Sequence, residues 1–463
     1  MLLKVLFDCS VNDISEYKKI LIKPELMKIN QKYKVAILKI VKDKIKNNRI
    51  LLFNFTSLSI LQICNYIFPL ITLPYLVRVL GPDHFGIVSF IIAFTGYFGM
   101  ITDYGFNLSG TQTVSINRLD RNKLNSIYSS ILFIKLFLFA VCIIVFALCL
   151  VSIDRFRADW LAYLAGFLSI LGNVLFPIWL FMGLEKMKYV SMINIYMKIL
   201  FTGSVFIFIS NQNDTVLYLF LYSLHLVLIG VVGLFISFYK LKIKFIIPSK
   251  NELKYHFREG WYVFLSTFSI SLYTISNTFI LGLFASNEVV GYFSAADKIR
   301  GAVQGFYSAI SQSVYPHLSA LFVASKESAL KFIKKLFSFV AICGTVTSLL
   351  TLLFADKIVT VFLGGQYEEA VLLLKIISFL PLIIMIGNVF GVQTLLNAGY
   401  KKSFTKILAF SAITNIIISF IFVPLYSAVG TTVIVMVIET LVTIGFYYEL
   451  RKNNIHIFKQ NYV

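Results

Sequence analysis

Charged side chains are scarce in this chain of 463 residues: Asp, Glu, Lys and Arg together make up 14%, whereas hydrophobic residues make up 58%. A soluble protein of this composition would expose an apolar surface and precipitate. The mean hydropathy of +0.82 agrees with this argument. The composition therefore excludes a soluble globular protein and predicts that the chain lies in a lipid bilayer.

The usual marks of enzymes and metalloproteins are missing as well. The five cysteines and five histidines show no spacing that suits zinc or a disulfide framework. The sequence has no P-loop and no Gly-Xaa-Ser-Xaa-Gly motif. The longest external loop, around Asp356 to Glu369, is too short to carry the catalytic residues of a polysaccharide polymerase or ligase. We therefore expect no catalysis and no cofactor, with a proton or sodium gradient, or the substrate gradient, as the driving force.

Long apolar runs are what the sequence has in abundance. A bilayer core about 30 Å thick needs roughly 20 apolar residues per helical span, and such runs recur from Leu51 to Tyr448. Their length and pattern predict an all-α integral membrane protein. About twelve transmembrane helices are expected, at approximately residues 51–80, 86–110, 128–153, 159–182, 190–210, 216–239, 258–285, 289–318, 332–355, 369–397, 404–424 and 427–449.

The net charge of +20 comes from basic residues that gather in alternate connections between these helices. Lys and Arg in short loops stay cytoplasmic, so the asymmetry orients the chain and makes a nucleic-acid partner unnecessary. Both termini are predicted to face the cytoplasm, which fits an even number of helices. The cytoplasmic connections carry Arg118, Arg121, Lys123, Lys186, Lys188, Lys240, Lys242, Lys244, Lys250, Lys254, Arg258, Lys326, Lys331, Lys334, Lys335, Lys401, Lys402 and Lys406, and the opposite set carries Arg78, Arg155, Arg157 and Lys357.

Short motifs repeat in order along the chain. The segment 86–90 resembles 291–295, and the Gly-Asn-Val of 172–174 recurs at 387–389. Each Gly-Asn-Val is followed, about ten residues on, by a glycine and then a pair of lysines. Such matches in register predict two six-helix repeats that share one orientation. The expected parts are a basic cytoplasmic leader (1–49), an N-terminal bundle (50–240), a cytoplasmic linker (241–257), a C-terminal bundle (258–450) and a cytoplasmic tail (451–463).

The leader admits two interpretations. Its many lysines could lie on anionic lipid headgroups, at about 1 kcal/mol for each basic residue. Alternatively, it is a solvated segment ahead of a true start near Met27.

A polar stripe on the eighth predicted helix is the strongest candidate for a functional site. It recurs at three- and four-residue steps, which place its members on one face. A charge held at the bilayer centre is costly, so it is a functional candidate by default. Arg300 lies roughly 17 Å along the helix, near the midplane, where its guanidinium could bind phosphate oxygens. The alternative is an Asp297–Arg300 pair made only for packing. The stripe consists of Asp297, Arg300, Gln304, Ser308 and Ser311.

Other polar residues within the helices are open to two interpretations each. Those of the seventh and second helices either line the same lumen or hydrogen-bond between helices: Ser266, Ser269, Tyr273 and Asn277, then Thr95, Gly99, Thr102, Asp103 and Asn107. Among the lysines, snorkelling toward headgroups is favoured for Lys135 and Lys375, whereas Lys198 and Lys298 lie deeper. Glu439 and His225 are candidates for ion coupling, with a buried neutral Glu439 as the alternative.

Several stretches together resemble the Wzx-type O-antigen flippases of the polysaccharide transporter family, within the superfamily of multidrug, oligosaccharidyl-lipid and polysaccharide exporters. The resemblance runs from about Leu51 to Asn453. The stretches that carry it are Phe68–Pro82, Asp103–Asn107, Pro177–Tyr189, Gly291–Ile299 and Ser311–Pro316.

The resemblance implies two six-helix bundles that form a V, with helices 1, 2, 7 and 8 around a cationic lumen in a bacterial inner membrane. It implies undecaprenyl-pyrophosphate-linked oligosaccharide as substrate, moved by alternating access, with a polysaccharide polymerase and a chain-length regulator as further candidate partners. At the matching positions, Asp297 and Lys298 are lumen or gate candidates. The alternatives are an ion-coupled drug or cation extruder, which several lumen carboxylates would serve better, and a peptidoglycan-precursor flippase, which usually has two further helices.

Overall fold

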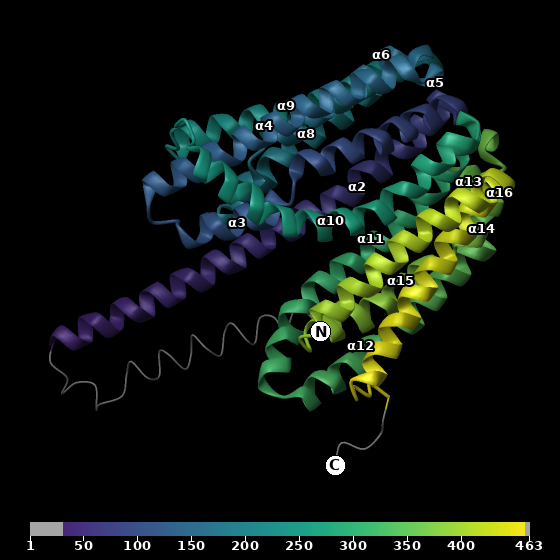
Figure 1. The fold of residues 1–463 in the computed structure, drawn as a ribbon. Coiled ribbons are helices and arrows are strands. Elements are labelled where there is room, and N and C mark those ends of the chain that lie inside the picture. Colours follow the sequence, from purple (N-terminus) through teal and green to yellow (C-terminus); the bar gives the residue numbers. More distant parts are fainter. Residues whose placement is uncertain (1–30, 459–463) are drawn as a thin grey trace. The chain divides into compact units, whose positions relative to one another are not determined.

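The computed structural model describes the backbone of residues 31–458 and the side chains of residues 60–458, apart from 262, 266 and 269–274. Contacts divide the chain into two compact units, Met1–Ser57 and Leu58–Val463, and the packing and sites described below belong to the second. Within the described range every regular element is a helix (Figure 1). This confirms the all-α prediction, while residues 1–30 of the predicted leader lie outside the described residues.

The first long helical segment, α2 (Gln31–Asp103), contains two helices separated at Gly81. Gly81 adopts a φ of 72°, a left-handed conformation that costs glycine little. The first helix ends at Leu80 as predicted, and the second begins at Pro82, because proline suits a first helical turn. The second helix ends earlier than predicted: Tyr104 and Gly105 both have positive φ, and α3 (Phe106–Ile116) starts after them.

A second interruption falls inside the predicted helix 159–182. The helix α6 (Trp160–Leu175) stops before Pro177, and α7 (Ile178–Gly183) continues after it. Proline has no backbone N–H, so it cannot donate to the carbonyl four residues earlier. The remaining elements of this half are α4 (Arg121–Ser152), α5 (Asp154–Ala158), α8 (Met187–Phe208), η2 (Gln212–Asp214), α9 (Thr215–Phe235) and η3 (Ile236–Lys240).

The second half begins with two long helices that are less apolar than the other long helices of this half. The first is α10 (Lys250–Phe284), which starts with a capping box between Ser249 and Glu252. The second is α11 (Asn287–Ala324). The last, α16 (Lys401–Lys452), again contains two helices, separated at Ser427 with a φ of 50°. The elements between α11 and α16 are α12 (Lys326–Leu353), α13 (Ala355–Phe362), η4 (Gly365–Tyr367), α14 (Ala370–Ile377), α15 (Leu380–Asn388) and the π-helical η5 (Val389–Leu396).

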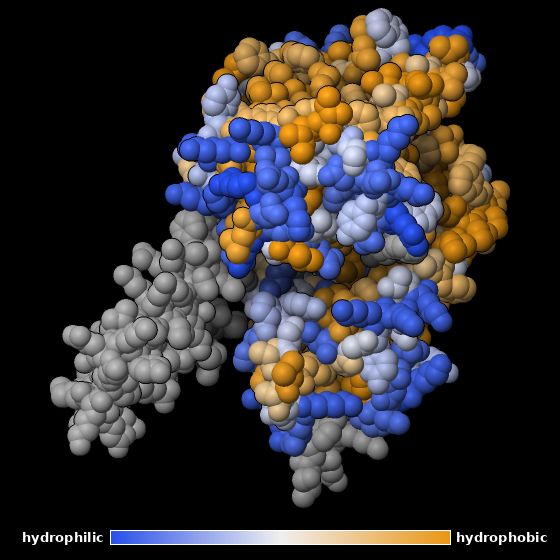
Figure 2. Space-filling view, turned by 60° about the vertical axis from the view of Figure 1, so that its left-hand side comes forward, coloured by the Kyte–Doolittle hydropathy of each residue, from blue (hydrophilic) through white to orange (hydrophobic). Residues whose placement is uncertain are grey.

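Eight helical stretches of the described residues are long and apolar enough to cross a membrane, and several of them, including those in α2 and α16, contain more than one helix. The chain is therefore a multi-pass membrane protein, and the number twelve stays a prediction. Wide hydrophobic areas cover the surface, with hydrophilic side chains gathered beside them (Figure 2). The eight stretches are Ile60–Ile116, Arg121–Ser152, Trp160–Gly183, Met187–Phe208, Gln212–Lys240, Lys326–Leu353, Ala370–Leu396 and Lys401–Lys452.

The largest apolar cluster joins the two halves. It contains buried residues of α2, α6, α11 and α14, and the rings of Phe90 and Phe279 stack within it with centroids 5.5 Å apart. The repeated glycines lie at close helix crossings. A Cβ on Gly172 would overlap the α9 backbone at Leu226, and one on Gly387 would lie 2.6 Å from Thr443 of α16. Both Gly-Asn-Val motifs thus pack against a later helix of their own half, while the predicted domain boundaries stay predictions.

Candidate functional site

A cavity of about 1140 Å³ lies among the helices of the first half and the two long helices that open the second. This volume is large enough to enclose a ligand with several sugar or phosphate groups. Its polar lining side chains include those of Asn65, Thr95, Asp103, Asn107, Lys135, Ser169, Asn173, Asn194, Lys198, Thr202, Tyr218, Tyr222, His225, Thr267, Thr278, Ser294, Asp297 and Lys298. Four predicted site residues, Asp103, Lys198, Asp297 and Lys298, and the predicted coupling residue His225 line it.

Lys135 also lines this cavity, and the prediction that it snorkels toward headgroups is wrong. Its side chain is 3% exposed, its ammonium donates to the Asn173 carbonyl at 2.9 Å, and Asp103 Oδ1 lies 3.9 Å away. The reason is the proline four residues after Asn173. Because Pro177 has no N–H to donate, the Asn173 carbonyl needs another partner, and a buried carbonyl without one costs about 1–3 kcal/mol.

Lys198 occupies a different part of the cavity wall. Its ammonium hydrogen-bonds to Asn65 Oδ1, which connects α8 with the first helix of α2. His225 of α9 is buried and stacks on Phe201, with ring centroids 4.5 Å apart. Lys298 is exposed at the cavity's α11 side. None of the ion pairs among the described residues includes Lys198 or Lys298.

The predicted stripe on α11 does not face one environment. Asp297 lines the cavity, whereas Arg300 and Gln304 are absent from its lining. The Arg300 Nε donates to Asp297 Oδ1 at 2.8 Å, so the pair that the sequence left as the packing alternative is formed. Further along, Ser311 donates to Asn388 Oδ1 at 2.7 Å and belongs to the second half's interior.

The other predicted positions are dispersed. Asn277 accepts a hydrogen bond from Asn415 of α16 at 3.2 Å. Of the two roles expected for Asn277, lining the lumen or bonding between helices, this contact is the second. Glu439 of α16 is half-buried and does not line the cavity. The side chain of Tyr273 lies outside the described residues. Lys375 is half-exposed and pairs with Asp356 at 2.9 Å, in line with its expected place near a helix end.

Several cavity residues were not singled out from the sequence as site residues. Asn65, Asn173 and Asn194 line the cavity beside the lysines, but isolated amides in apolar helices carry no distinctive pattern. Asn173 had one usable signal, a proline four residues later, which frees its carbonyl.

The two halves are closed against each other at the Gly81 end of the cavity. The repeat-related glycines Gly86 and Gly291 face one another there: a Cβ on Gly86 would overlap the Asn287 carbonyl, and one on Gly291 would overlap the Pro82 carbonyl. Side-chain bonds reinforce the crossing. Arg155 donates to the Gly282 carbonyl and to Asn287 Oδ1, and Gln366 Nε2 donates to the carbonyls of Val77 and Arg78 at 3.2 and 3.1 Å.

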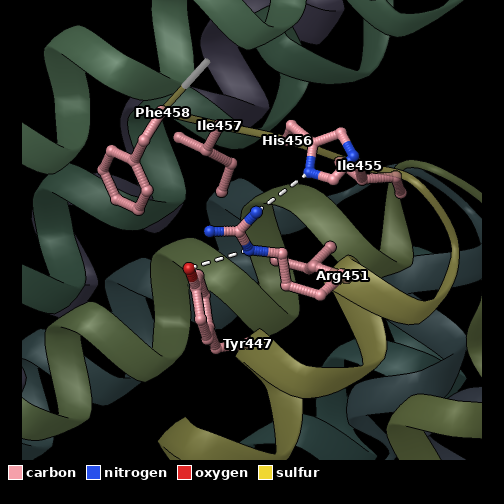
Figure 3. Close-up of a pocket in the computed structure, with 7 residues that line it drawn as sticks. Tyr447, Arg451, Ile455, His456, Ile457 and Phe458 are labelled. Carbon is pink, nitrogen blue, oxygen red and sulfur yellow. Dashed lines mark hydrogen bonds between the residues drawn. The ribbon is translucent and has the colours of Figure 1, made fainter.

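A second, much smaller pocket of about 120 Å³ lies at the end of α16 (Figure 3). Arg451 points between two neighbours, donating to Tyr447 OH at 2.9 Å and lying 3.3 Å from His456 Nδ1 (Figure 3). The pocket shares no lining residue with the large cavity. Its contacts hold the chain that follows α16 against the helix.

Comparison with known proteins identifies the family. Residues 51–322 match the model of the family described as "Polysaccharide biosynthesis protein". A protein of Escherichia coli (strain K12) named as an O-antigen transporter is 33% identical over 87% of this chain and 97% of its own length. The chain belongs to this family. A protein of Shigella dysenteriae with the same name is 29% identical over 84% of this chain and 98% of its own length.

Solved structures of low identity share the fold. The lipid II flippase MurJ in an inward closed conformation superposes with a TM-score of 0.65 at 14% identity, over 86% of this chain and 87% of MurJ. A multidrug resistance MATE family transporter in an inward-facing conformation gives 0.63 at 16% identity, over 86% and 98%. The predicted membership of the Wzx-type polysaccharide flippases is confirmed, and the family is one of transporters.

Proposed function

We propose that this polysaccharide flippase moves an undecaprenyl-pyrophosphate-linked oligosaccharide across the bacterial cytoplasmic membrane. The observation that carries the proposal is a large polar cavity inside a membrane protein, in which the ammonium groups of Lys198 and Lys298 have no carboxylate partner among the described residues. A charged group is kept in such a place only where a ligand or a counter-charge repays its desolvation.

The charges of the cavity favour an anionic headgroup. Lys135 has Asp103 beside it, and Asp297 accepts from Arg300, so both carboxylates of the wall are already paired with bases. Lys198 and Lys298 remain, and a pyrophosphate supplies the anionic oxygens that ammonium groups bind. A drug or cation extruder is less well served, because a cationic substrate needs unpaired carboxylates.

The closed crossing at the Gly81 end supports a mechanism of alternating access. By the charge asymmetry of the loops this end is extracytoplasmic, so the headgroup enters from the cytoplasm while the polyprenyl tail stays in lipid. Separation of Gly86 from Gly291 would then open the cavity outward. A proton or sodium gradient would reset the cycle, with His225 in the cavity wall and Glu439 in α16 as the coupling groups. A polymerase and a chain-length regulator would receive the product outside.

The test is genetic. Deletion of the gene should leave complete lipid-linked repeat units inside the cell and remove surface polysaccharide. A Lys198→Met, Lys298→Met double variant that is present in the membrane should reproduce the deletion, and Lys375→Met, a matched change in a half-exposed helix-end lysine, should restore polysaccharide to normal. Normal polysaccharide from the double variant would refute the headgroup assignment. Loss of peptidoglycan synthesis instead would favour a peptidoglycan-precursor flippase.

A further inference from the structure

Two interrupted helices meet at the end of the cavity that lies furthest from Gly81. The break between α2 and α3 falls at Tyr104 and Gly105, and the break between α6 and α7 falls before Pro177. The helices α3 and α7 that follow the breaks pack closely: Gly183 lies against Val114, and Thr111 Oγ1 is 3.4 Å from the Trp179 carbonyl. Irregular backbone within a membrane is tolerated where it is buried or lines a cavity, and paired interruptions of this kind point to a binding site.

The polar groups at this junction have unused hydrogen-bonding capacity. The Lys135 ammonium has three N–H donors and, among the described residues, makes one hydrogen bond, to the Asn173 carbonyl. Asp103 Oδ1 lies 3.9 Å from that ammonium, which is an ion pair but is too long for a hydrogen bond. Asn107 Oδ1 is buried and has no hydrogen-bond partner among the described residues. Asp103, Asn107 and Lys135 all line the cavity.

The set suits a neutral ligand that both donates and accepts. A phosphate placed here would meet the Asp103 carboxylate, and a metal cation would meet the Lys135 ammonium, so neither charge sign is favoured. Neighbouring hydroxyl groups of a sugar ring can donate to Asp103 and Asn107 Oδ1 while accepting from Lys135. Buried polar groups that only the correct ligand can satisfy also discriminate strongly between that ligand and its analogues. An analogue that lacks the matching hydroxyl group leaves the protein's polar groups unpaired.

We propose that Asp103, Asn107 and Lys135 form a sugar-recognition subsite, separate from the phosphate-binding lysines. The proposal rests on the proposed function. At a rise of 1.5 Å per residue, Asp103 lies roughly 33 Å from Gly81 along the axis of its helix. Asn65, the partner of Lys198, lies roughly 24 Å from Gly81 along the axis of the preceding helix. The two groups of residues therefore differ in depth by about 9 Å, so one substrate would reach both with different parts of its headgroup.

Binding of two lipids to the purified full-length protein tests this. One probe is undecaprenyl pyrophosphate, which has no sugar, and the other is the undecaprenyl-pyrophosphate-linked repeat unit extracted from a host that lacks the transporter. Asn107→Ala removes an unpartnered oxygen and should leave folding intact. We expect it to weaken binding of the sugar-bearing lipid about tenfold, the effect of one lost hydrogen bond in a buried site, and to change that of the sugar-free lipid less than twofold.

Matched variants separate the outcomes. Lys198→Met should weaken both lipids, and Asp103→Asn only the sugar-bearing one, with thermal unfolding in detergent as the check on folding. If Asn107→Ala and Asp103→Asn weaken both lipids equally, or neither, the subsite is refuted while the proposed function stands. If the unaltered protein binds neither lipid, the proposed function itself fails and the subsite fails with it.

Discussion

The two Gly-Asn-Val motifs of the molecule are held by different kinds of polar contact. In the first half, the Gly-Asn-Val motif in α6 has its Asn173 carbonyl satisfied by the Lys135 ammonium, beside Asp103 and open to the cavity. In the second half, the side-chain oxygen Oδ1 of Asn388 accepts from Ser311, and Gln393 Nε2 donates to Ser311 Oγ at 2.9 Å. That neutral network does not line the cavity.

The difference explains where a ligand can bind. A neutral network that is largely satisfied within the protein fixes one arrangement of its helices and has few groups left for a ligand. An ammonium held by one carbonyl and one carboxylate keeps spare donors. Of the two Gly-Asn-Val motifs, only the one in the first half therefore contributes to the cavity wall.

The largest expected effect comes from removing the charge in the first half. Lys135→Met leaves the Asp103 carboxylate without its counter-charge and the Asn173 carbonyl without a donor, which should cost about 3–5 kcal/mol of stability. Ser311→Ala removes a neutral hydroxyl at the corresponding network and should cost about 1–3 kcal/mol. Chemical denaturation in detergent micelles measures both. Equal losses would show that the two networks are energetically alike.

The glycine crossing should give the next effect, on transport more than on folding. Gly86→Ala and Gly291→Ala each place a methyl group against a backbone carbonyl of the other half, so the closed arrangement should lose about 1–3 kcal/mol relative to the open one. A cysteine at Asn65 should then react faster with a membrane-impermeant maleimide added outside intact cells.

Gly203 supplies the control for that experiment. A Cβ at Gly203 of α8 would meet no atom within 4 Å, so Gly203→Ala should leave both transport and labelling as they are. If the cysteine at position 65 reacts at the same rate in Gly86→Ala as in Gly203→Ala, the glycine crossing does not control access to the cavity from outside.

The smallest effect concerns the polar contact between the halves at the start of α10. Ser126 of α4 donates to Glu252, and this bond, together with those from Ser249, holds the pKa of the Glu252 carboxyl below its ordinary value. A carboxyl whose pKa is lower in the folded than in the unfolded protein stabilises the fold. This stabilisation is fully present at pH values above the unfolded-state pKa, and it is lost as the pH falls through the folded-state pKa. Because Glu252 is only partly buried and water screens its charge, we expect no more than about 1 kcal/mol.

Unfolding of Glu252→Gln should therefore differ from that of the unaltered protein at pH 7 and should match it in acid, below the range in which the carboxyl titrates. A difference that persists unchanged in acid would assign the effect to packing and not to charge.

Much of the fold followed from hydropathy and charge. The first helix ends at Leu80 as expected, and α11 forms in spite of its polar stripe. The interruptions at Tyr104 and at Pro177 were not predicted, because the apolar runs continue across both of them, although Gly105 and Pro177 are residues that commonly end a helix. Family membership followed from short motifs that are specific in combination.

The candidate site could be predicted in part. Asp103, Lys198, Asp297 and Lys298 line the cavity, since a charge within an apolar helix has few other uses. Arg300 was expected at the ligand, but it pairs with Asp297, and helix periodicity alone cannot choose between a partner three residues away and a cavity. Lys135 was misjudged because snorkelling depends on which neighbours a helix face meets, and this information is absent from a single sequence.

Translocation by the purified protein tests the central claim most directly. Proteoliposomes would contain the lipid-linked repeat unit with a fluorescent sugar, and a membrane-impermeant quencher would report the fraction that reaches the outer leaflet. We predict transfer of the labelled lipid by the unaltered protein and at least a tenfold slower transfer by the Lys198→Met, Lys298→Met variant. Transfer at the same rate by both proteins would contradict the assignment of the basic cavity to the pyrophosphate headgroup.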